Sequence, residues 1–176
     1  ILIAFIGLVC SVPAAAQEQI NRYDTRIIVQ ADGDIEVTET IEVNAEGNQI
    51  RRGIFRDLPR YYTLDTERLP NTYSVVRVQR DGRKELYETS TDQNAYRIRI
   101  GDPERMLEPG RHTYEIAYTV KNQVRYFTDY DELYWNVTGS YWAFPIVSAR
   151  AEIILPTGAV ITGASAYTGA QGDTGT

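Results

Sequence analysis

Few side chains in this sequence are of the types that catalyse reactions or bind transition metals. His112 is the only histidine and Cys10 the only cysteine among 176 residues. A Ser-His-Asp or Cys-His catalyst would have to use His112, and no nucleophile-elbow motif accompanies it. A zinc site with several histidines cannot form within one chain that has a single histidine. We therefore expect no catalytic role for His112 and no cofactor.

Acidic side chains are the next candidates for chemistry. Asp129, Asp131 and Glu132 form one run, and Asp102 and Glu104 form another. Paired carboxylates serve glycosidases, and clusters of oxygen ligands bind calcium. The Asp-x-Asp-x-Asp-Gly spacing of an EF-hand is absent, and acidic runs in loops are usually only solvated. These acids predict no metal site, but a glycan-active hydrolase that uses Asp129–Glu132 stays open as an alternative function.

Glu39 stands in the middle of an apolar row. With a period of two, it shares one strand face with Ile35, Val37, Ile41 and Val43. A buried lone carboxylate is too costly to stay charged, so it must pair, protonate or leave the row. The segment RRGIFRDLP soon afterwards supplies Arg52 and Arg56. We hypothesise a structural ion pair between Glu39 and one of these arginines; the alternative is an exposed Glu39 at a bulge or sheet edge.

The segment DELYWNVTGSYW, Asp131–Trp142, contains both tryptophans of the chain. Strand alternation places Trp135 on an apolar face, where we expect it in the core. Trp142 follows a Gly-Ser break, so we expect it, together with Asp131, to offer a contact surface. Asn136 begins the sequon Asn-Val-Thr, but it lies within an expected strand, and we expect no glycan there.

Alternation with a period of two dominates the rest of the chain, and no segment keeps a helical period. Turn signals occur at Asp32-Gly33, Asp81-Gly82 and Pro109-Gly110. The region 57–71 holds two prolines, and we interpret it as a long loop or edge connection. Many short strands with regular turns predict an all-β fold, an antiparallel β-sandwich that is immunoglobulin-like or related. The expected strands are 23–29, 35–43, 72–80, 84–88, 95–100, 111–120, 132–138 and 149–155.

The first seventeen residues, ILIAFIGLVCSVPAAAQ, are typical of the apolar core and cleavage region of a secretory signal peptide. The apolar run is shorter than the ~20 residues of a spanning helix. We expect cleavage after Ala16, although an uncleaved anchor and a buried core helix are alternatives. Val9 before Cys10 disfavours a lipoprotein signal. If Cys10 leaves with the leader, the mature domain has neither a disulfide nor a thiol nucleophile.

These patterns divide the chain into three parts. Residues 1–16 are the expected signal peptide, trimmed at its start, 17–160 the β-sandwich domain, and 161–176 the end of the domain or a Gly/Thr-rich linker. The net charge of −6 and the pI of about 4.9 exclude the basic footprint of a nucleic-acid-binding protein. The acids and bases are interspersed, and the charge is typical of a soluble surface.

Five motifs, in order, resemble a known family. They are GDIEVTETIEV, RRGIFRDLP, EPGRHTYEIAYTV, DELYWNVTGSYW and AEIILP. Together they resemble the N-terminal region of the predicted bacterial membrane proteins of domain-of-unknown-function family 2207, the YciQ-like proteins, from about Ile20 to Leu155. The resemblance implies a signal peptide, an extracytoplasmic β domain and then transmembrane helices outside this chain. It implies no established activity.

The sequence therefore predicts an exported, non-enzymatic domain on the extracytoplasmic side of a bacterial cell membrane. Binding, sensing or assembly in the cell envelope is the expected role, with an envelope protein or a glycan as partner. The alternatives are the hydrolase named above and a purely structural spacer. A hydrolase needs two carboxyl groups within about 10 Å of each other in a concave site, whereas a binding module needs an exposed patch.

Overall fold

The computed structural model describes residues 17–64 and 66–167, and within them all regular secondary structure is β-strand. The expected signal peptide, 1–16, and residues 168–176 lie outside the described residues. No helix in the described part is long and apolar enough to cross a membrane. The strands are β1 (Gln19–Val29), β2 (Ile35–Ala45), β3 (Ile54–Pro59), β4 (Tyr61–Leu64), β5 (Glu67–Pro70), β6 (Tyr73–Arg80), β7 (Arg83–Lys84), β8 (Tyr87–Thr91), β9 (Ala95–Ile100), β10 (Gly110–Val120), β11 (Val124–Tyr126), β12 (Asp131–Leu133) and β13 (Ala149–Ile154).

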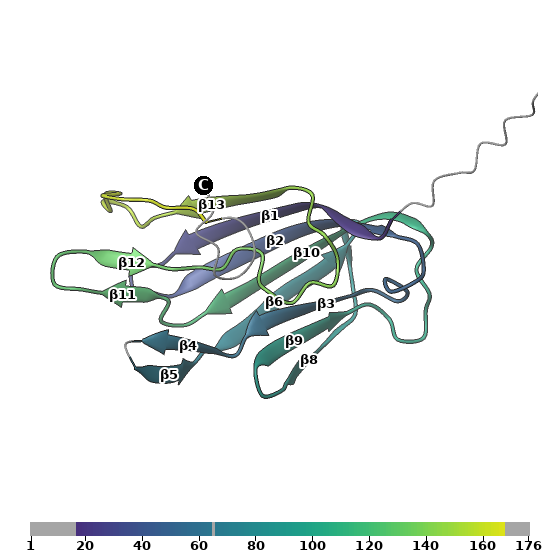
Figure 1. The fold of residues 1–176 in the computed structure, drawn as a ribbon, viewed down its shortest axis with the longest axis horizontal. Helices are drawn as coiled ribbons and strands as arrows, with labels where there is room; N and C mark the ends of the chain where they lie inside the picture. Colours follow the sequence, from purple (N-terminus) through teal and green to yellow (C-terminus); the bar gives the residue numbers. More distant parts are fainter. Residues whose placement is uncertain (1–16, 65, 168–176) are drawn as a thin grey trace, which may run out of the picture.

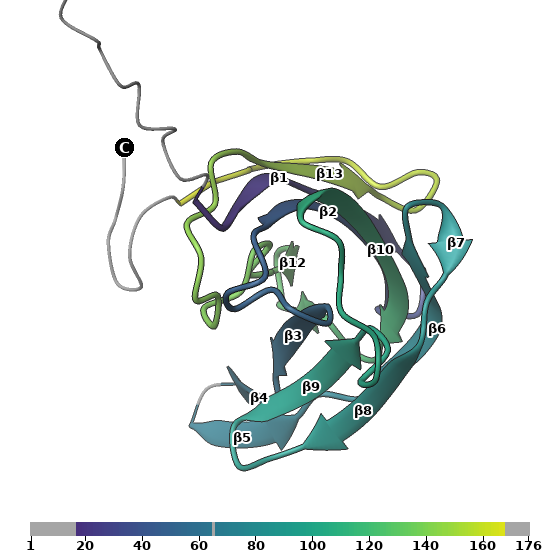
Figure 2. The same cartoon turned by 90° about the vertical axis from the view of Figure 1, so that its right-hand side faces the viewer.

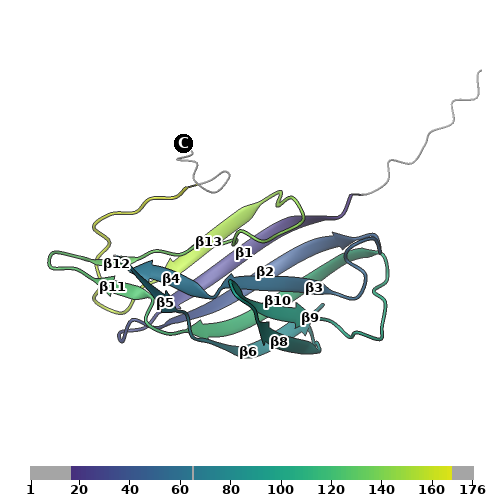
Figure 3. The ribbon, with the colours of Figure 1, turned by 60° about the horizontal axis from the view of Figure 1, so that its bottom comes forward.

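A large sheet and a small sheet enclose the core. The large sheet has the strand order β13-β1-β2-β10-β6-β7, and the small sheet has the order β3-β9-β8. Figure 1 shows the long strands of the large sheet side by side, and Figure 2 shows the small sheet on the concave side of the large one. Two hairpins, β4-β5 and β11-β12, complete the fold near one end of the long strands (Figure 3). The all-β class predicted from the sequence is confirmed.

The core follows from strict alternation along the longest strands. Alternate side chains of β2 and β10 are buried on the face toward the small sheet, while the residues between them are partly or fully exposed. The small sheet contributes Ile54 and Leu58 from β3 and Ile98 and Ile100 from β9. Glu39 and Arg56 are the only charged side chains that belong to these buried rows in the described residues. The sequence pattern and the observed core therefore agree, including the glutamate in the middle of the row.

One pairing in the large sheet is parallel, contrary to the expectation of a purely antiparallel fold. β13 runs parallel to β1, with Tyr23 opposite Ala149 and Ile28 opposite Ile154. The cause is the long connection after β12, which returns to the start of β1, where the Ile20 N–H donates to the Pro145 carbonyl at 3.0 Å. β13 must then run in the same direction as β1.

The region 57–71 is not a long loop, so the first of the two interpretations given for it is wrong. β3 continues to Pro59, and Tyr61–Leu64 pairs with Glu67–Pro70 in a hairpin. Both prolines are compatible with this arrangement because each is the last residue of its strand, where the missing N–H costs little.

The expected strand 132–138 is also shorter than predicted, because β12 ends at Leu133. A turn at Asn136 takes over: the Gly139 N–H donates to the Asn136 side-chain oxygen at 3.0 Å, and Gly139 has a φ of +76°. The side chains of Asn136 and Ser140 are bonded at 3.1 Å. A polar turn thus replaces the second half of the expected strand.

The expected strand 84–88 is split between the two sheets. β7 pairs with β6 in the large sheet, whereas β8 pairs with β9 in the small sheet. Glu85 and Leu86 therefore form a crossing from one layer to the other. This crossing creates a hollow between the layers at one end of the molecule.

The loop between β2 and β3 is held by a carboxylate. Glu18, which is 9% exposed, accepts hydrogen bonds from four backbone N–H groups of Glu46, Asn48, Gln49 and Ile50 at 2.7–3.1 Å. Burial alone would raise the pKa of Glu18, but these four bonds outweigh it and the pKa is lowered. The bonds fix the path of the loop, which leads directly to Arg51 and Arg52.

Candidate functional site

The structure places Arg56, not Arg52, against Glu39. Arg56 donates to the two carboxylate oxygens at 2.8 and 2.7 Å, and both side chains are 1% exposed or less. The Tyr118 hydroxyl donates a third hydrogen bond at 2.6 Å. Burial opposes the charge of Arg56, but the adjacent carboxylate outweighs burial and raises the pKa of Arg56 above its usual value. The pair links β2 of the large sheet to β3 of the small sheet.

Trp142 is partly exposed, and its ring lies over this ion pair. Its ring is half-buried, lies 5.9 Å from the Arg56 guanidinium and meets Tyr23 edge-on, with the ring centroids 5.9 Å apart. The Trp142 indole N–H donates to the Thr138 carbonyl at 2.7 Å. The cause is the turn described above, which folds the segment back over β1.

Trp135 and Asp131, the other two residues predicted from this segment to be in the core or on a contact surface, differ from Trp142 in their surroundings. Trp135 is half-buried and packs against the core, so it lies at the core margin rather than fully inside. Its indole N–H is buried with no hydrogen-bond partner in the described part of the chain. Asp131 is exposed at the start of β12.

The buried ion pair brings together four of the motifs identified in the sequence. Glu39 comes from GDIEVTETIEV, Arg56 from RRGIFRDLP, and Tyr118 from EPGRHTYEIAYTV. Gly139 of DELYWNVTGSYW lies so close to Arg56 that an added Cβ would collide with the guanidinium Nη1. The pair is therefore a structural centre closed to ligands, and a functional site must be sought elsewhere.

The acidic runs do not assemble into a site. In the residues that the structure describes, no group of three or more His, Cys, Asp or Glu side chains is placed to hold a metal ion. Asp129 and Asp131 are exposed, and Glu132 lies 3.8 Å from Arg125. Asp102 accepts the Glu104 N–H at 2.9 Å, as an acid in a turn does. Each acid thus has an ordinary surface role.

The strongest concave candidate is a pocket of about 440 Å³ at the crossing between β7 and β8. Leu86 and Leu107 supply apolar walls. A second hollow of about 390 Å³ adjoins it and adds Arg83 and Asp81. The charged side chains that line the larger pocket are Arg52, Arg80, Lys84, Arg105, Glu85 and Asp102.

Two glycines bring the walls of the pocket together. Gly53 has a φ of +135° and Gly101 a φ of +125°. An added Cβ on Gly53 would collide with the Ile100 carbonyl, and one on Gly101 with the Arg52 carbonyl. The two backbones can touch only because both residues lack a side chain. This contact places Arg52 beside the loop that carries Arg105.

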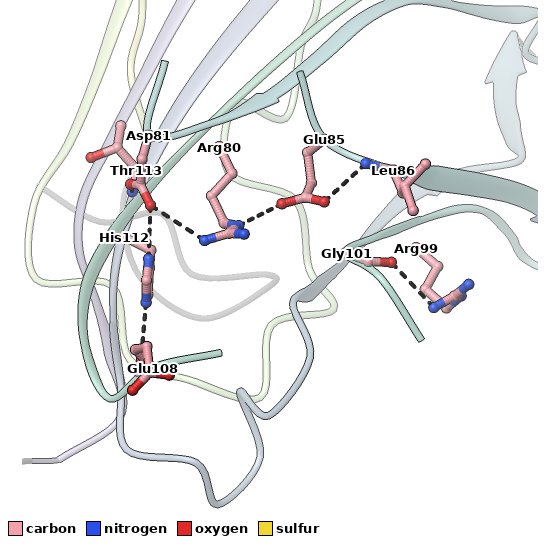
Figure 4. A network of polar contacts seen from close by, with 9 residues as sticks. All are labelled: Arg80, Asp81, Glu85, Leu86, Arg99, Gly101, Glu108, His112 and Thr113. Carbon is pink, nitrogen blue, oxygen red and sulfur yellow. Dashed lines mark hydrogen bonds and ion pairs between the residues drawn. The ribbon is translucent and has the colours of Figure 1, made fainter. Parts of the chain in front are cut away.

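Arg80 and Glu85 neutralise each other within the pocket. Arg80 Nε donates to Glu85 Oε2 at 2.5 Å, and Glu85 Oε1 accepts the Leu86 N–H at 2.9 Å (Figure 4). Burial alone would lower the pKa of Arg80, but the bond and the charge of Glu85 raise it. These two side chains are preorganised and contribute little net charge.

The remaining cations are not neutralised. Arg52, Lys84 and Arg105 are exposed and take part in none of the ion pairs of the described residues, and Asp102 is the one further carboxylate in the lining. Arg83 in the adjoining hollow is exposed in the same way. A chain of net charge −6 thus concentrates positive charge at one pocket. Such a pocket attracts oxyanions, which accept charge-assisted hydrogen bonds.

A polar network lies behind the pocket. Asp81, at the turn between β6 and β7, accepts the Thr113 N–H at 2.8 Å and faces His112 Nδ1 at 2.9 Å (Figure 4). His112 Nε2 faces the Glu108 carbonyl at 2.8 Å. Burial alone would raise the pKa of Asp81, but the bonds from His112 and Thr113 lower it. The Asp81-Gly82 turn predicted from the sequence is present, with φ values of 52° and 74°.

Comparison with known proteins agrees with the motifs. Residues 19–175 match the family described as "Predicted membrane protein (DUF2207) N-terminal domain". The chain belongs to this family. It is also 34% identical over 161 residues to the uncharacterized protein YciQ of Escherichia coli (strain K12), across 90% of this chain and 26% of YciQ. The domain is thus the N-terminal domain of a predicted membrane protein of unknown function, and it spans about a quarter of that relative.

Solved structures match only part of this chain. An M1 zinc metallopeptidase from Deinococcus radiodurans matches 58% of this chain and 20% of its own chain, with 19% identity and a TM-score of 0.41. Native yeast LTA4 hydrolase matches 58% of this chain and 14% of its own, with 13% identity and a TM-score of 0.43. These partial likenesses give no reason to assign a peptidase or hydrolase activity.

Proposed function

We propose that this domain lies on the extracytoplasmic side of the membrane and binds an anionic glycan polymer of the cell envelope without catalysing a reaction. The observation that carries the proposal is the surplus of positive charge in the 440 Å³ pocket, where Arg52, Lys84 and Arg105 face a single further carboxylate. The leader-like residues 1–16 and the membership of a membrane-protein family support the export of the domain.

The pocket chemistry fits phosphate or carboxylate groups. Arginine presents a planar fork that matches the two oxygens of either group, and lysine adds a mobile point charge. The apolar walls of Leu86 and Leu107 suit the carbon face of a sugar ring. A repeating anion would fill both hollows at once, since they share Arg80, Lys84, Glu85 and Arg105. The binding should weaken as salt is added, because these cations are exposed.

Titration of the purified chain with long-chain polyphosphate and with polygalacturonate tests the proposal by calorimetry. We expect saturable binding of at least one polymer, and a loss of about tenfold or more in affinity for the double variant Arg52→Gln, Arg105→Gln, which removes two charge-assisted contacts. The matched control is Arg26→Gln, Arg77→Gln, which changes the net charge equally on two arginines that pair with Glu152 and Glu115. Equal losses in both double variants, or no binding at all, would contradict the pocket as the site.

The side of the membrane can be tested separately. Thr89→Cys places a thiol on strand β8, whose residues are all exposed. In cells that express the whole membrane protein, we expect a membrane-impermeant maleimide to label this thiol without lysis. Labelling that requires lysis would place the domain on the cytoplasmic side.

A further inference from the structure

His112 has hydrogen-bond acceptors on both sides of its ring. Asp81 Oδ2 lies 2.9 Å from Nδ1, and the Glu108 carbonyl lies 2.8 Å from Nε2 (Figure 4). A neutral imidazole has one N–H, so one of its nitrogens would present a lone pair to an oxygen. Only the imidazolium donates to both acceptors.

Two segments of the chain contribute the groups that contact His112 or Asp81. Asp81 and Arg80 come from the end of β6 and the turn after it, and Glu108 comes from the loop before β10. Strand β2 places the buried apolar Val43 opposite His112 in the sheet register. His112 thus has one carboxylate contact, Asp81, and its side chain is 12% exposed.

Asp81 connects His112 to the pocket. Its Oδ2 atom contacts both His112 Nδ1, at 2.9 Å, and Arg80 Nη1, at 3.4 Å. Arg80 lines both hollows. When His112 is charged, it neutralises Asp81. When His112 is neutral, the full negative charge of Asp81 faces Arg80 and the adjoining cations, and the positive field of the pocket falls by one unit of charge.

We propose that protonation of His112 strengthens anion binding in the pocket, so that the domain binds its anionic ligand more tightly in acid. This inference rests on the proposed function. His112 is a positioning residue here, because it acts through Asp81 and Arg80 and does not itself line either hollow. One added charge near the pocket corresponds to roughly three- to tenfold in affinity at a surface site. Histidine is the side chain whose charge ordinarily changes between about pH 5 and 8.

The test measures the affinity for long-chain polyphosphate between about pH 8 and pH 5, the range in which histidine ordinarily titrates. The internal groups of this polymer keep one charge each across that range. We expect the unsubstituted chain to bind about three- to tenfold more tightly at the acid end. His112→Gln should bind with a nearly constant affinity, close to that of the unsubstituted chain at the alkaline end. Arg111→Gln, which removes an exposed neighbouring charge paired with Glu42, should keep the pH dependence.

Proton uptake gives a second, independent readout. If protonation favours binding, then binding must favour protonation by the same factor. Calorimetry in two buffers with different heats of ionisation should show protons taken up on binding by the unsubstituted chain and none by His112→Gln. Binding with no pH dependence, or a dependence that survives in His112→Gln, overturns this inference and leaves the proposed function standing. No binding at any pH overturns both.

Discussion

Two regions of this domain each contain a central arginine. In one region its charge is neutralised by a buried carboxylate, and in the other it is exposed to solvent. Arg56 is 1% exposed and meets a carboxylate through two hydrogen bonds. Arg52, only four residues earlier, is exposed in a pocket where cations outnumber carboxylates. The difference shows how burial decides the role of a charge. A buried guanidinium needs a carboxylate partner within the fold. An exposed guanidinium is solvated by water and stays available to bind a ligand.

The same difference predicts which property, stability or binding, a substitution in each region should change. Changes at the buried pair should cost folding stability, because they leave a charge without its partner. Changes in the pocket should cost binding and leave stability almost unchanged. Four variants, ordered by expected effect on the free energy of unfolding, test this separation.

The largest effect is expected for Arg56→Met. This change leaves the Glu39 carboxylate buried beside the Tyr118 hydroxyl without its cation, which should cost about 3–5 kcal/mol. Urea denaturation followed by tryptophan fluorescence measures the loss. The triple variant Glu39→Leu, Arg56→Met, Tyr118→Phe removes both charges and the Tyr118 hydroxyl at once, and it should lose less stability than Arg56→Met alone. A triple variant that is less stable than the single one would contradict this account.

Gly139→Ala should have the next largest effect. The added methyl group collides with Arg56 Nη1 at a residue whose φ is +76°, and we expect a loss of about 2–4 kcal/mol from strain and overpacking together. Gly82→Ala is the matched control, since Gly82 has a φ of +74° with nothing within 4 Å of the added atom. Thermal unfolding of both variants separates the collision from the backbone strain. Equal losses of stability in Gly139→Ala and Gly82→Ala would show that the added methyl group at Gly139 does not collide with Arg56.

Glu18→Gln should destabilise the domain by about 1–2 kcal/mol at neutral pH, because it removes the charge that four backbone N–H groups share. The pKa of Glu18 is lowered in the folded chain. Its stabilising contribution is therefore complete above the unfolded value of about 4.3 and is lost as the pH falls through the lower folded value.

Denaturation of Glu18→Gln and of the unsubstituted chain at about pH 7 and pH 3 checks this prediction, since these values lie on either side of the ordinary glutamate pKa. The difference in stability should shrink in acid. Glu67→Gln, at an exposed position of the β4-β5 hairpin, should change stability little at either pH. A difference that grows in acid would contradict the lowered pKa.

The smallest effect on stability is expected for the pocket variant Arg52→Gln, Arg105→Gln. Both side chains are exposed and outside the ion pairs of the described residues, so the free energy of unfolding should change by no more than about 0.5 kcal/mol. The same variant is the one expected to lose anion binding. A large loss of stability would mean that the pocket cations belong to the fold, and the contrast between the two regions would fail.

Much of this organisation could be predicted from the sequence, because it depends on alternation. The buried row of β2, with Glu39 at its centre, follows directly from a period of two. The need for a cation follows from the cost of burying a carboxylate. The choice between Arg52 and Arg56 could not be made, since it depends on Gly53 ending the loop and β3 beginning at Ile54.

The pocket could not be predicted in the same way. Arg52 and Arg105 lie in two separate loops and Lys84 in the short strand β7, and they meet only because the chain crosses between sheets at Glu85–Leu86. The sequence shows basic segments around Arg52 and Arg83, but it does not show which segments lie next to each other in the fold. The contact of Trp142 with Arg56 could not be predicted for a related reason: it depends on the return of the segment over β1.

The parallel pairing of β13 with β1 also has a consequence for the order of folding. Arg26 of β1 and Glu152 of β13 are 126 residues apart in the chain, whereas β1 and β2 meet through a short turn. If the chain is exported with its N-terminus first, β1 and β2 can pair early, and the far edge of β1 stays open until residues 149–154 arrive. An open edge strand is a template for wrong pairing. Among the described strands, β13 is therefore the last to be exported, and it is the strand that covers the open edge of β1.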